Sequence, residues 1–110
     1  MKFKYVIKRS GTQVPFNKTR IMNAIYRAAV SVGGRDKKRA EILAAKVIEL
    51  LENTYEQNYT PHIEEIQDAV EKVLIEHGHA QVAKEFILYR NEQNKKRQED
   101  AKLASIPDEN

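Results

Sequence analysis

Four basic residues lie around the expected start of a helix, where their chemistry could bind an anion. Lys8 and Arg9 precede a Ser-Gly turn, and Lys18 and Arg20 fall in the first helical turn. The helix macrodipole favours acids at such a start, so stability alone does not explain these cations. Backbone N–H groups and basic side chains that converge at a helix N-terminus are suited to phosphate. The pattern indicates an anion site; an exposed, solvated basic hairpin is the alternative.

The residue types needed for catalysis or for a resident metal do not form a recognisable set. The chain has no Cys and three His, and the spacing of the histidines does not suggest a metal site, so they are expected at the surface. The adjacent acids at 64–65 and 99–100 are expected on helix surfaces. Neither a Ser/His/Asp arrangement nor a Walker-type loop occurs in the sequence. The sequence therefore predicts binding without hydrolysis.

The composition fits one globular domain with an uneven charge. The chain has 110 residues, of which 41% are hydrophobic and 32% are charged. The net charge is +3, yet residues 1–39 hold eleven Lys and Arg against one acid, and residues 40–110 hold eight against fifteen. A basic N-terminal third suggests a local anionic partner. No apolar run approaches membrane-spanning length and no signal-peptide core is present, so a cytoplasmic location is expected.

These cations must be positioned by a hairpin and the helix after it. Apolar and polar residues alternate before Ser10-Gly11, which predicts a β-hairpin over about residues 2–16. We expect it to have little apolar surface of its own and to be the most mobile structured part without ligand. Asn17 is a suitable N-cap for a helix over about 18–32, which Gly33-Gly34 ends. Its expected core face consists of Ile21, Ala24, Ile25, Ala28 and Val32.

Three further helices are expected along the rest of the chain. Asp36 can cap a helix over about 37–53, and residues 54–59 have weak strand character that would suit a short third strand beside the hairpin. Thr60-Pro61 predicts a helix over about 61–77, with Thr60 as N-cap and Gly78 after its end. Its expected buried face consists of Ile63, Ile66, Val70, Val73 and Leu74. A last helix begins near residue 79, carries Val82, Ala83, Phe86 and Tyr89 on one face, and becomes polar all round after residue 91. The predicted fold is α+β and mainly helical: a four-helix bundle capped by a small antiparallel sheet.

An ordered set of short motifs resembles the ATP-cone, the regulatory nucleotide-binding domain of many ribonucleotide reductases. The resemblance covers about residues 3–92 and looks closest to anaerobic, glycyl-radical reductases. It implies a nucleotide domain over 1–92, followed by a polar helical extension or linker over 93–110. The motifs are Val6-Ile7-Lys8-Arg9-Ser10-Gly11, Phe16-Asn17, Arg20-Ile21, Thr60, Glu65-Ile66-Gln67-Asp68-Ala69-Val70, Val82-Ala83-Lys84 and Tyr89-Arg90.

The resemblance also implies which residues bind ATP or dATP, together with Mg²⁺. Lys8, Arg9 and Arg20 match positions that face phosphate, Asn17 matches one near the base, and Thr60 matches a threonine that contacts the nucleotide. Departures from the family pattern are Ser10, Val14, Glu64 and Asn91, which leave the base contacts and a second nucleotide open. The complete expected set is Val6, Lys8, Arg9, Phe16, Asn17, Arg20, Ile21, Thr60, Glu64 and Arg90.

The implied function is a non-catalytic allosteric domain that controls a ribonucleotide reductase. Its expected partner is the catalytic domain or subunit of that enzyme, and nucleotide-dependent self-association is compatible with this role. The alternative is a nucleotide-sensing fragment of a transcriptional repressor or another nucleic-acid-binding module, which the basic N-terminal third permits. The repressor of this family reads DNA through a four-Cys zinc ribbon, however, and this chain has no Cys. Nucleic acid and membrane are therefore not the expected partners.

Overall fold

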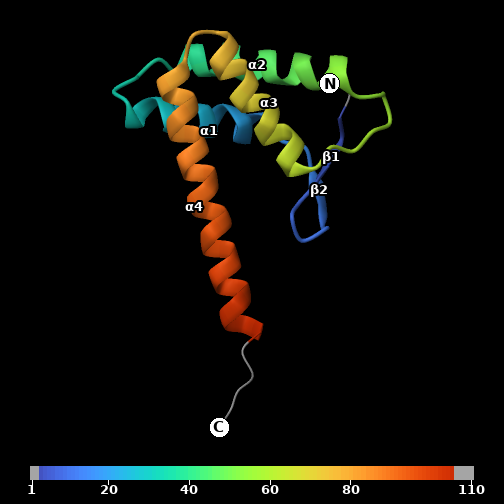
Figure 1. Cartoon of the computed structure of the whole chain (residues 1–110). Helices are drawn as coiled ribbons and strands as arrows, with labels where there is room; N and C mark the ends of the chain where they lie inside the picture. The colour runs from blue at the N-terminus through green and yellow to red at the C-terminus, as the bar shows by residue number, and fades with distance from the viewer. Residues whose placement is uncertain (1–2, 106–110) are drawn as a thin grey trace.

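The computed structural model describes residues 3–105, with side chains described up to residue 96. A two-stranded antiparallel sheet precedes four helices, and Figure 1 shows the hairpin beside the lower end of α3 while α4 extends far beyond the bundle. This arrangement confirms the predicted mainly helical α+β fold. The elements are β1 (Tyr5–Ile7), β2 (Gln13–Pro15), α1 (Lys18–Ser31), α2 (Lys37–Thr54), α3 (Ile63–Glu76) and α4 (Ala80–Ser105).

Local sequence signals set most helix ends as expected. Asn17 Oδ1 accepts a hydrogen bond from the Thr19 backbone N–H at 2.9 Å, and Asp36 Oδ1 accepts one from the Arg39 backbone N–H at 3.0 Å. Gly33 and Gly78 follow α1 and α3 with φ values of 90° and 80°, which glycine adopts without steric cost. These caps fix where α1 enters the bundle, and hence where its basic first turn lies.

The core lies between the helices and reaches under the hairpin. α1 packs against α2 and α4, and α3 packs against the same two helices. Val32 is not part of this core, contrary to the prediction: it is 41% exposed because α1 ends at Ser31 and the chain turns away at Gly33. The core residues include Phe3, Val6, Ile21, Ile25, Ala28, Leu43, Val47, Leu51, Ile66, Val70, Leu74, Ala83 and Phe86.

The hairpin is anchored at its base, so the expectation that it has little apolar surface is wrong. Phe3 and Val6 are only 3% and 8% exposed, and the Phe3 ring stacks on Phe16 with centroids 5.6 Å apart. Val6 pairs with Val14 in the antiparallel register. Gly11 takes the tight turn with a φ of 88°. The base of the hairpin therefore belongs to the core, and its basic tip lies outside it.

The expected third strand over 54–59 is not formed. α2 continues to Thr54, and the following residues form a turn in which the Tyr55 and Tyr59 rings stack with centroids 4.5 Å apart. The outer edge of β1 instead meets a later segment: the Ile7 backbone N–H donates to the Pro61 carbonyl at 2.9 Å, and Ile7 forms a parallel bridge with His62. The hairpin is thus joined to the chain directly before α3.

α3 begins two residues later than predicted, at Ile63 and not at Pro61. His62 occupies the N-cap position, and its backbone N–H donates to Glu65 Oε1 at 2.8 Å, the second half of a capping box. Pro61 is fully buried and its carbonyl is bonded to β1, so the extended chain continues through this proline. Thr60 consequently lies in the connection and does not cap the helix.

α4 packs through its first turns and then leaves the bundle (Figure 1). Ala83 and Phe86 are buried and Val82 is half-buried, as predicted, whereas Tyr89 is 41% exposed and its hydroxyl accepts a hydrogen bond from Arg27 Nη1 at 2.9 Å. The helix is continuous across residue 92, where the domain boundary was expected, so that boundary stays a prediction. Among the described residues, no helix combines the length and apolar character required to cross a bilayer.

Candidate functional site

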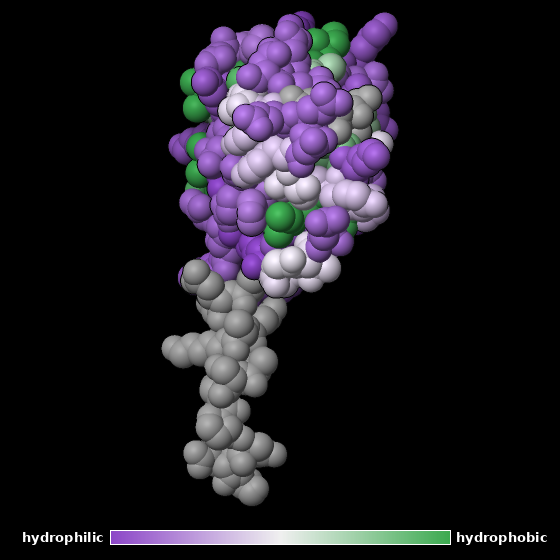
Figure 2. All heavy atoms as spheres, turned by 90° about the vertical axis from the view of Figure 1, so that its right-hand side faces the viewer, coloured by the Kyte–Doolittle hydropathy of each residue, from purple (hydrophilic) through white to green (hydrophobic). Residues whose placement is uncertain are grey.

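A cavity of about 460 Å³ lies between the hairpin, the start of α1 and the start of α3. Its volume falls in the range of small-ligand sites in proteins. Figure 2 looks onto the hairpin side of the molecule, where hydrophilic side chains dominate and hydrophobic groups form only small patches. The cavity is lined by Val6, Lys8, Arg9, Val14, Pro15, Phe16, Asn17, Arg20, Ile21, Ile63 and Ile66.

One part of the cavity wall is apolar and includes a half-buried aromatic ring. Val6 and Phe16 come from the hairpin side, and Ile21 comes from the first turn of α1. Ile63 and Ile66 face them from the first turn of α3. Such a wall can accept a flat, largely apolar group such as a purine ring. The sequence placed both isoleucines on the buried stripe of α3, but their spacing gave no sign that they also border a site.

The polar part of the cavity wall brings three cations together. Lys8 and Arg9 lie at the tip of the hairpin, and Arg20 extends from the first turn of α1, which contains no acid. Lys18 does not line the cavity, although the sequence grouped it with the other three. The three side chains can contact an extended anion along its length, as a polyphosphate requires.

Asn17 lines the cavity, and its cap already uses part of the anion-binding capacity expected at the helix start. The Thr19 backbone N–H is bonded to Asn17 Oδ1, and the Arg20 backbone N–H donates to the Asn17 carbonyl at 3.1 Å. Two amides that could have bound a phosphate therefore have partners within the protein. The attraction for an anion rests mainly on the side chains of Lys8, Arg9 and Arg20.

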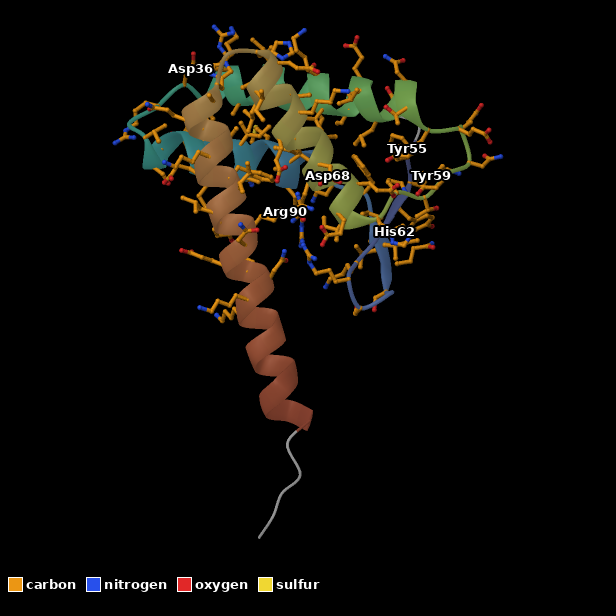
Figure 3. The ribbon with its side chains drawn as sticks, viewed as in Figure 1. Asp36, Tyr55, Tyr59, His62, Asp68 and Arg90 are labelled. Carbon is orange, nitrogen blue, oxygen red and sulfur yellow. The ribbon has the colours of Figure 1, made fainter. Side chains whose placement is uncertain are left out.

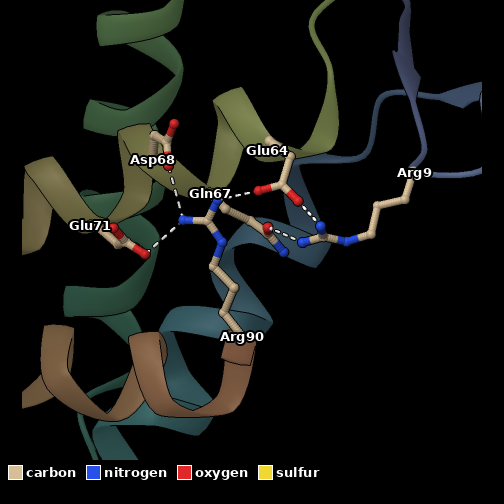
Figure 4. Close-up of polar contacts among 6 residues, drawn as sticks. All are labelled: Arg9, Glu64, Gln67, Asp68, Glu71 and Arg90. Carbon is tan, nitrogen blue, oxygen red and sulfur yellow. Dashed lines mark hydrogen bonds and ion pairs between the residues drawn. The ribbon is translucent and has the colours of Figure 1, made fainter. Parts of the chain in front are cut away.

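At the edge of the cavity, Arg9 takes part in an ionic network that spans three elements (Figure 4). Its guanidinium forms an ion pair with Glu64 and donates from Nη2 to Gln67 Oε1 at 3.0 Å. The other carboxylate oxygen of Glu64 pairs with Arg90 from α4. Arg90 Nη1 also donates to Asp68 and Glu71, at 2.9 and 2.7 Å. The network links the hairpin, α3 and α4.

Arg90 is the most buried charged member of this network, with a side chain that is 13% exposed. Burial alone would lower the pKa of Arg90, but the hydrogen bonds that its guanidinium donates to Glu71 and Asp68 raise the pKa above its usual value. Arg90 does not line the main cavity; it borders a neighbouring hollow of about 190 Å³ that Arg20 and Ile21 also line. The resemblance of Tyr89-Arg90 to a family motif identified Arg90 as a candidate site residue. It did not predict the acidic partners of Arg90.

The ten expected site residues therefore fall into three groups. Glu64 and Arg90 lie beside the cavity and do not line it. Glu64 contacts the lining residue Arg9, and Arg90 contacts Glu64. Thr60 is half-buried in the connection before α3 and is not among the lining residues. The residues that line the cavity directly are Val6, Lys8, Arg9, Phe16, Asn17, Arg20 and Ile21.

A second cluster of polar side chains stabilises the connection between α2 and α3, with which β1 pairs. Tyr59 Oη donates to both carboxylate oxygens of Glu65, at 2.7 and 2.8 Å, and Figure 3 shows Tyr55, Tyr59 and His62 together at this end of the molecule. This hydrogen bond, more than burial, raises the pKa of Tyr59 to about 12. Burial alone would raise the pKa of Glu65, but bonds from the His62 amide and the two tyrosines lower it. The cluster fixes the segment that pairs with Ile7.

The cavity residues suit an anionic ligand and do not themselves form a metal site. None of the lining residues is a carboxylate, and Glu64, which contacts the lining residue Arg9, is paired with two arginines. Among the side chains described, those of residues 3–96, no group of three or more His, Cys, Asp or Glu is placed to hold an ion. Mg²⁺ normally takes carboxylate, phosphate and water oxygens. These residues therefore do not fit a Mg²⁺ ion bound by the protein alone.

Comparison with known proteins matches this chain to one domain family and to several reductases. The ATP cone domain profile matches residues 4–95. The vitamin B12-dependent ribonucleoside-diphosphate reductase of Thermoplasma acidophilum is 41% identical over 111 residues, covering 96% of this chain and 14% of that protein. The ribonucleoside-diphosphate reductase subunit alpha of Treponema pallidum is 36% identical over 99 residues, covering 84% and 12%.

An anaerobic reductase is also among the relatives, as the motifs suggested. The anaerobic ribonucleoside-triphosphate reductase of Salmonella typhimurium is 34% identical over 99 residues, covering 90% of this chain and 13% of that protein. The chain thus spans only about an eighth of the length of these relatives.

Proposed function

Because the chain belongs to the ATP-cone family, we propose that it is a regulatory domain that binds ATP or dATP in the cavity under the hairpin. The observation that carries this proposal is the cavity itself, which joins an apolar wall to three cations. Lys8, Arg9 and Arg20 are also the residues that match the phosphate-facing positions of the family. Sequence motif and geometry thus support the same ligand class.

The proposed arrangement assigns each part of the cavity to one part of the nucleotide. The adenine packs between Phe16 and the isoleucines of α3, where burial of its faces is favourable. The triphosphate extends toward Lys8, Arg9 and Arg20, whose charge-assisted hydrogen bonds supply most of the polar attraction. Mg²⁺ enters with the nucleotide and takes its ligands from phosphate and water oxygens, since the cavity wall offers no carboxylate.

The proposed role is allosteric, and the partner is the catalytic part of a ribonucleotide reductase. The relatives carry the name of this enzyme, while the matched region is only about an eighth of their length. An effector shifts the equilibrium between two states only if it binds them with different affinities. ATP and dATP must therefore differ in how they hold the hairpin or α3 if they are to give opposite signals.

Calorimetry with ATP, dATP and GTP tests the proposal directly. We expect ATP and dATP to bind the 110-residue chain with a defined stoichiometry and GTP to bind more weakly. Equal affinity for all three, or no binding, would contradict an adenine nucleotide site. The same samples should release no ADP, because the cavity wall contains no carboxylate or histidine to act as a base.

A titration with duplex DNA separates this proposal from the alternative of a nucleic-acid-binding module. Binding to DNA through phosphates weakens steeply as salt is raised from about 50 to 200 mM. We expect DNA binding to be weak and salt-sensitive, and ATP binding to be tighter and to depend less on salt. Tight DNA binding that ATP does not alter would favour the alternative.

A further inference from the structure

Glu64 is placed where it can compete with a bound ligand for Arg9. The Arg9 side chain borders the cavity, yet its guanidinium is turned to Glu64 and Gln67 on α3 (Figure 4). Carboxylate and phosphate oxygens use the same N–H donors of a guanidinium, often two at a time. A ligand phosphate that binds Arg9 in this way must therefore take donors that the α3 residues now occupy.

We propose that Glu64 is an internal competitor for the nucleotide's phosphates, which holds Arg9 in the ligand-free domain and releases it when a polyphosphate binds. This inference rests on the function proposed above. It gives Glu64 a different role from the other expected site residues: Glu64 opposes binding and does not contact the nucleotide.

Arg90 makes the exchange feasible because it keeps Glu64 paired after Arg9 leaves. The two arginines bind different oxygens of the Glu64 carboxylate, so one bond can break while the other persists. The Arg90 side chain is held in place by Asp68 and Glu71 and is only 13% exposed. The carboxylate is therefore not left without a charged partner, which would be costly beside a buried group.

The exchange would also change which elements are connected. In the structure described here, the ionic network ties the hairpin to α3 and, through Arg90, to α4. Loss of the contact between Arg9 and Glu64 leaves the link between α3 and α4 but uncouples the hairpin tip from it. Nucleotide binding would thus remove one ion pair from α3 without any movement of the core.

The test is the affinity of the Glu64→Gln variant for ATP, measured by calorimetry on the 110-residue chain. We expect tighter binding by about fivefold, the scale of one partly exposed ion pair. Glu71→Gln is the matched control, because it removes the same charge from the group around Arg90 and leaves the contact between Arg9 and Glu64 intact. Thermal unfolding of both variants checks that they remain folded.

A double-mutant cycle tests whether the effect of Glu64→Gln depends on the contact between Glu64 and Arg9. In an Arg9→Ala background, Glu64→Gln should no longer tighten binding. Equal effects of Glu64→Gln and Glu71→Gln, or a persisting effect without Arg9, would show that only net charge matters and would overturn the inference. Weaker binding of Glu64→Gln would overturn it as well, since Glu64 would then assist the ligand. If the unsubstituted chain binds no adenine nucleotide, the proposed function itself fails, which is a distinct result.

Discussion

Lys8 and Lys18 form a natural pair for testing the phosphate site at the level of single residues. Lys8 lines the cavity, whereas Lys18, in the first turn of α1, does not. We expect Lys8→Ala to weaken ATP binding by about 1.5–3 kcal/mol, the scale of a charge-assisted hydrogen bond. Lys18→Ala removes the same charge and should change the affinity much less. Calorimetry that found equal losses for the two variants would place the phosphates outside the hairpin.

Glu65 gives a prediction about pH that does not depend on the nucleotide. Its pKa is lowered in the folded state from an ordinary value of 4.5, so its contribution to stability is complete above that value and is lost as the pH falls through the folded pKa. Glu65→Gln should therefore lower the free energy of unfolding at pH 7, by about 1 kcal/mol for a half-buried helix cap.

The difference between Glu65→Gln and the unsubstituted chain should begin to shrink as the pH falls below 4.5, and it should be smallest below the folded pKa of Glu65, where both carry a neutral side chain. Chemical denaturation between pH 3 and about pH 7 measures it. A difference that stays constant over this range would mean that the charge of Glu65 is irrelevant to the cap, and that only side-chain packing is lost.

At the residue scale, the sequence predicted what each side chain could do but not which way it points. The cations of the hairpin and of α1 were identified because their chemistry is unusual at a helix start. The contact between Arg9 and Glu64 was not predicted, since the two residues are far apart in the chain and meet only after β1 has docked beside His62. Ile63 and Ile66 were recognised as core residues only, because one apolar stripe can face both the core and a cavity.

The hairpin consists of an anchored base and a tip outside the core, and this narrows the expectation that the whole hairpin is the most mobile structured part without ligand. Its base is anchored by Phe3, Val6 and the bond from Ile7 to Pro61, so the mobile part should be the tip over residues 8–12. We expect ATP to slow amide hydrogen exchange most at this tip, because the phosphates bring its cations against Arg20. Exchange at β1 should change little.

Hydrogen-exchange mass spectrometry with and without ATP measures this contrast, and α2 serves as the internal reference because it contributes no residue to the cavity wall. Unchanged exchange at the tip of a saturated protein would show a preformed site. A signal to a partner would then have to leave through α1 or α3.

The start of α3 shows why an element boundary can be missed although the element is found. Thr60-Pro61 is a common way to begin a helix, and the local sequence carries no warning against it. Pro61 is instead drawn into the extended segment that pairs with β1, which moves the cap to His62 and Glu65. The same tertiary pairing replaced the expected third strand, because the outer edge of β1 was completed by residues 61–62 and not by 54–59.

For the molecule as a whole, ligand binding should appear as increased stability. A ligand present at about 100 times its dissociation constant adds roughly 2.7 kcal/mol to the free energy of unfolding. For a domain of this size the melting temperature should rise on the order of 10 °C. Differential scanning calorimetry with ATP and with inorganic triphosphate tests this. The triphosphate should stabilise less, because it leaves the apolar wall of the cavity uncovered.

The bundle was predictable because its signals are local and agree with one another. Asn17, Asp36, Gly33 and Gly78 mark helix ends, and the apolar residues between them recur at helical spacing. Three of the features that sequence reasoning missed are tertiary: the pairing of β1 with residues 61–62, the anchoring of the hairpin and the partners of Arg90. Each depends on contacts between segments that no local pattern connects.

The pairing of β1 with the segment before α3 also bears on solubility. A two-stranded sheet has two outer edges, and an edge with unpaired N–H groups can recruit a strand from another molecule. The outward N–H of Ile7 is bonded to Pro61. On β2, Phe16 donates inward to Lys4, so by alternation the position of Pro15 faces outward, where proline has no N–H to offer. Two outward positions of the hairpin, Ile7 and Pro15, thus offer no N–H group to a strand from another molecule.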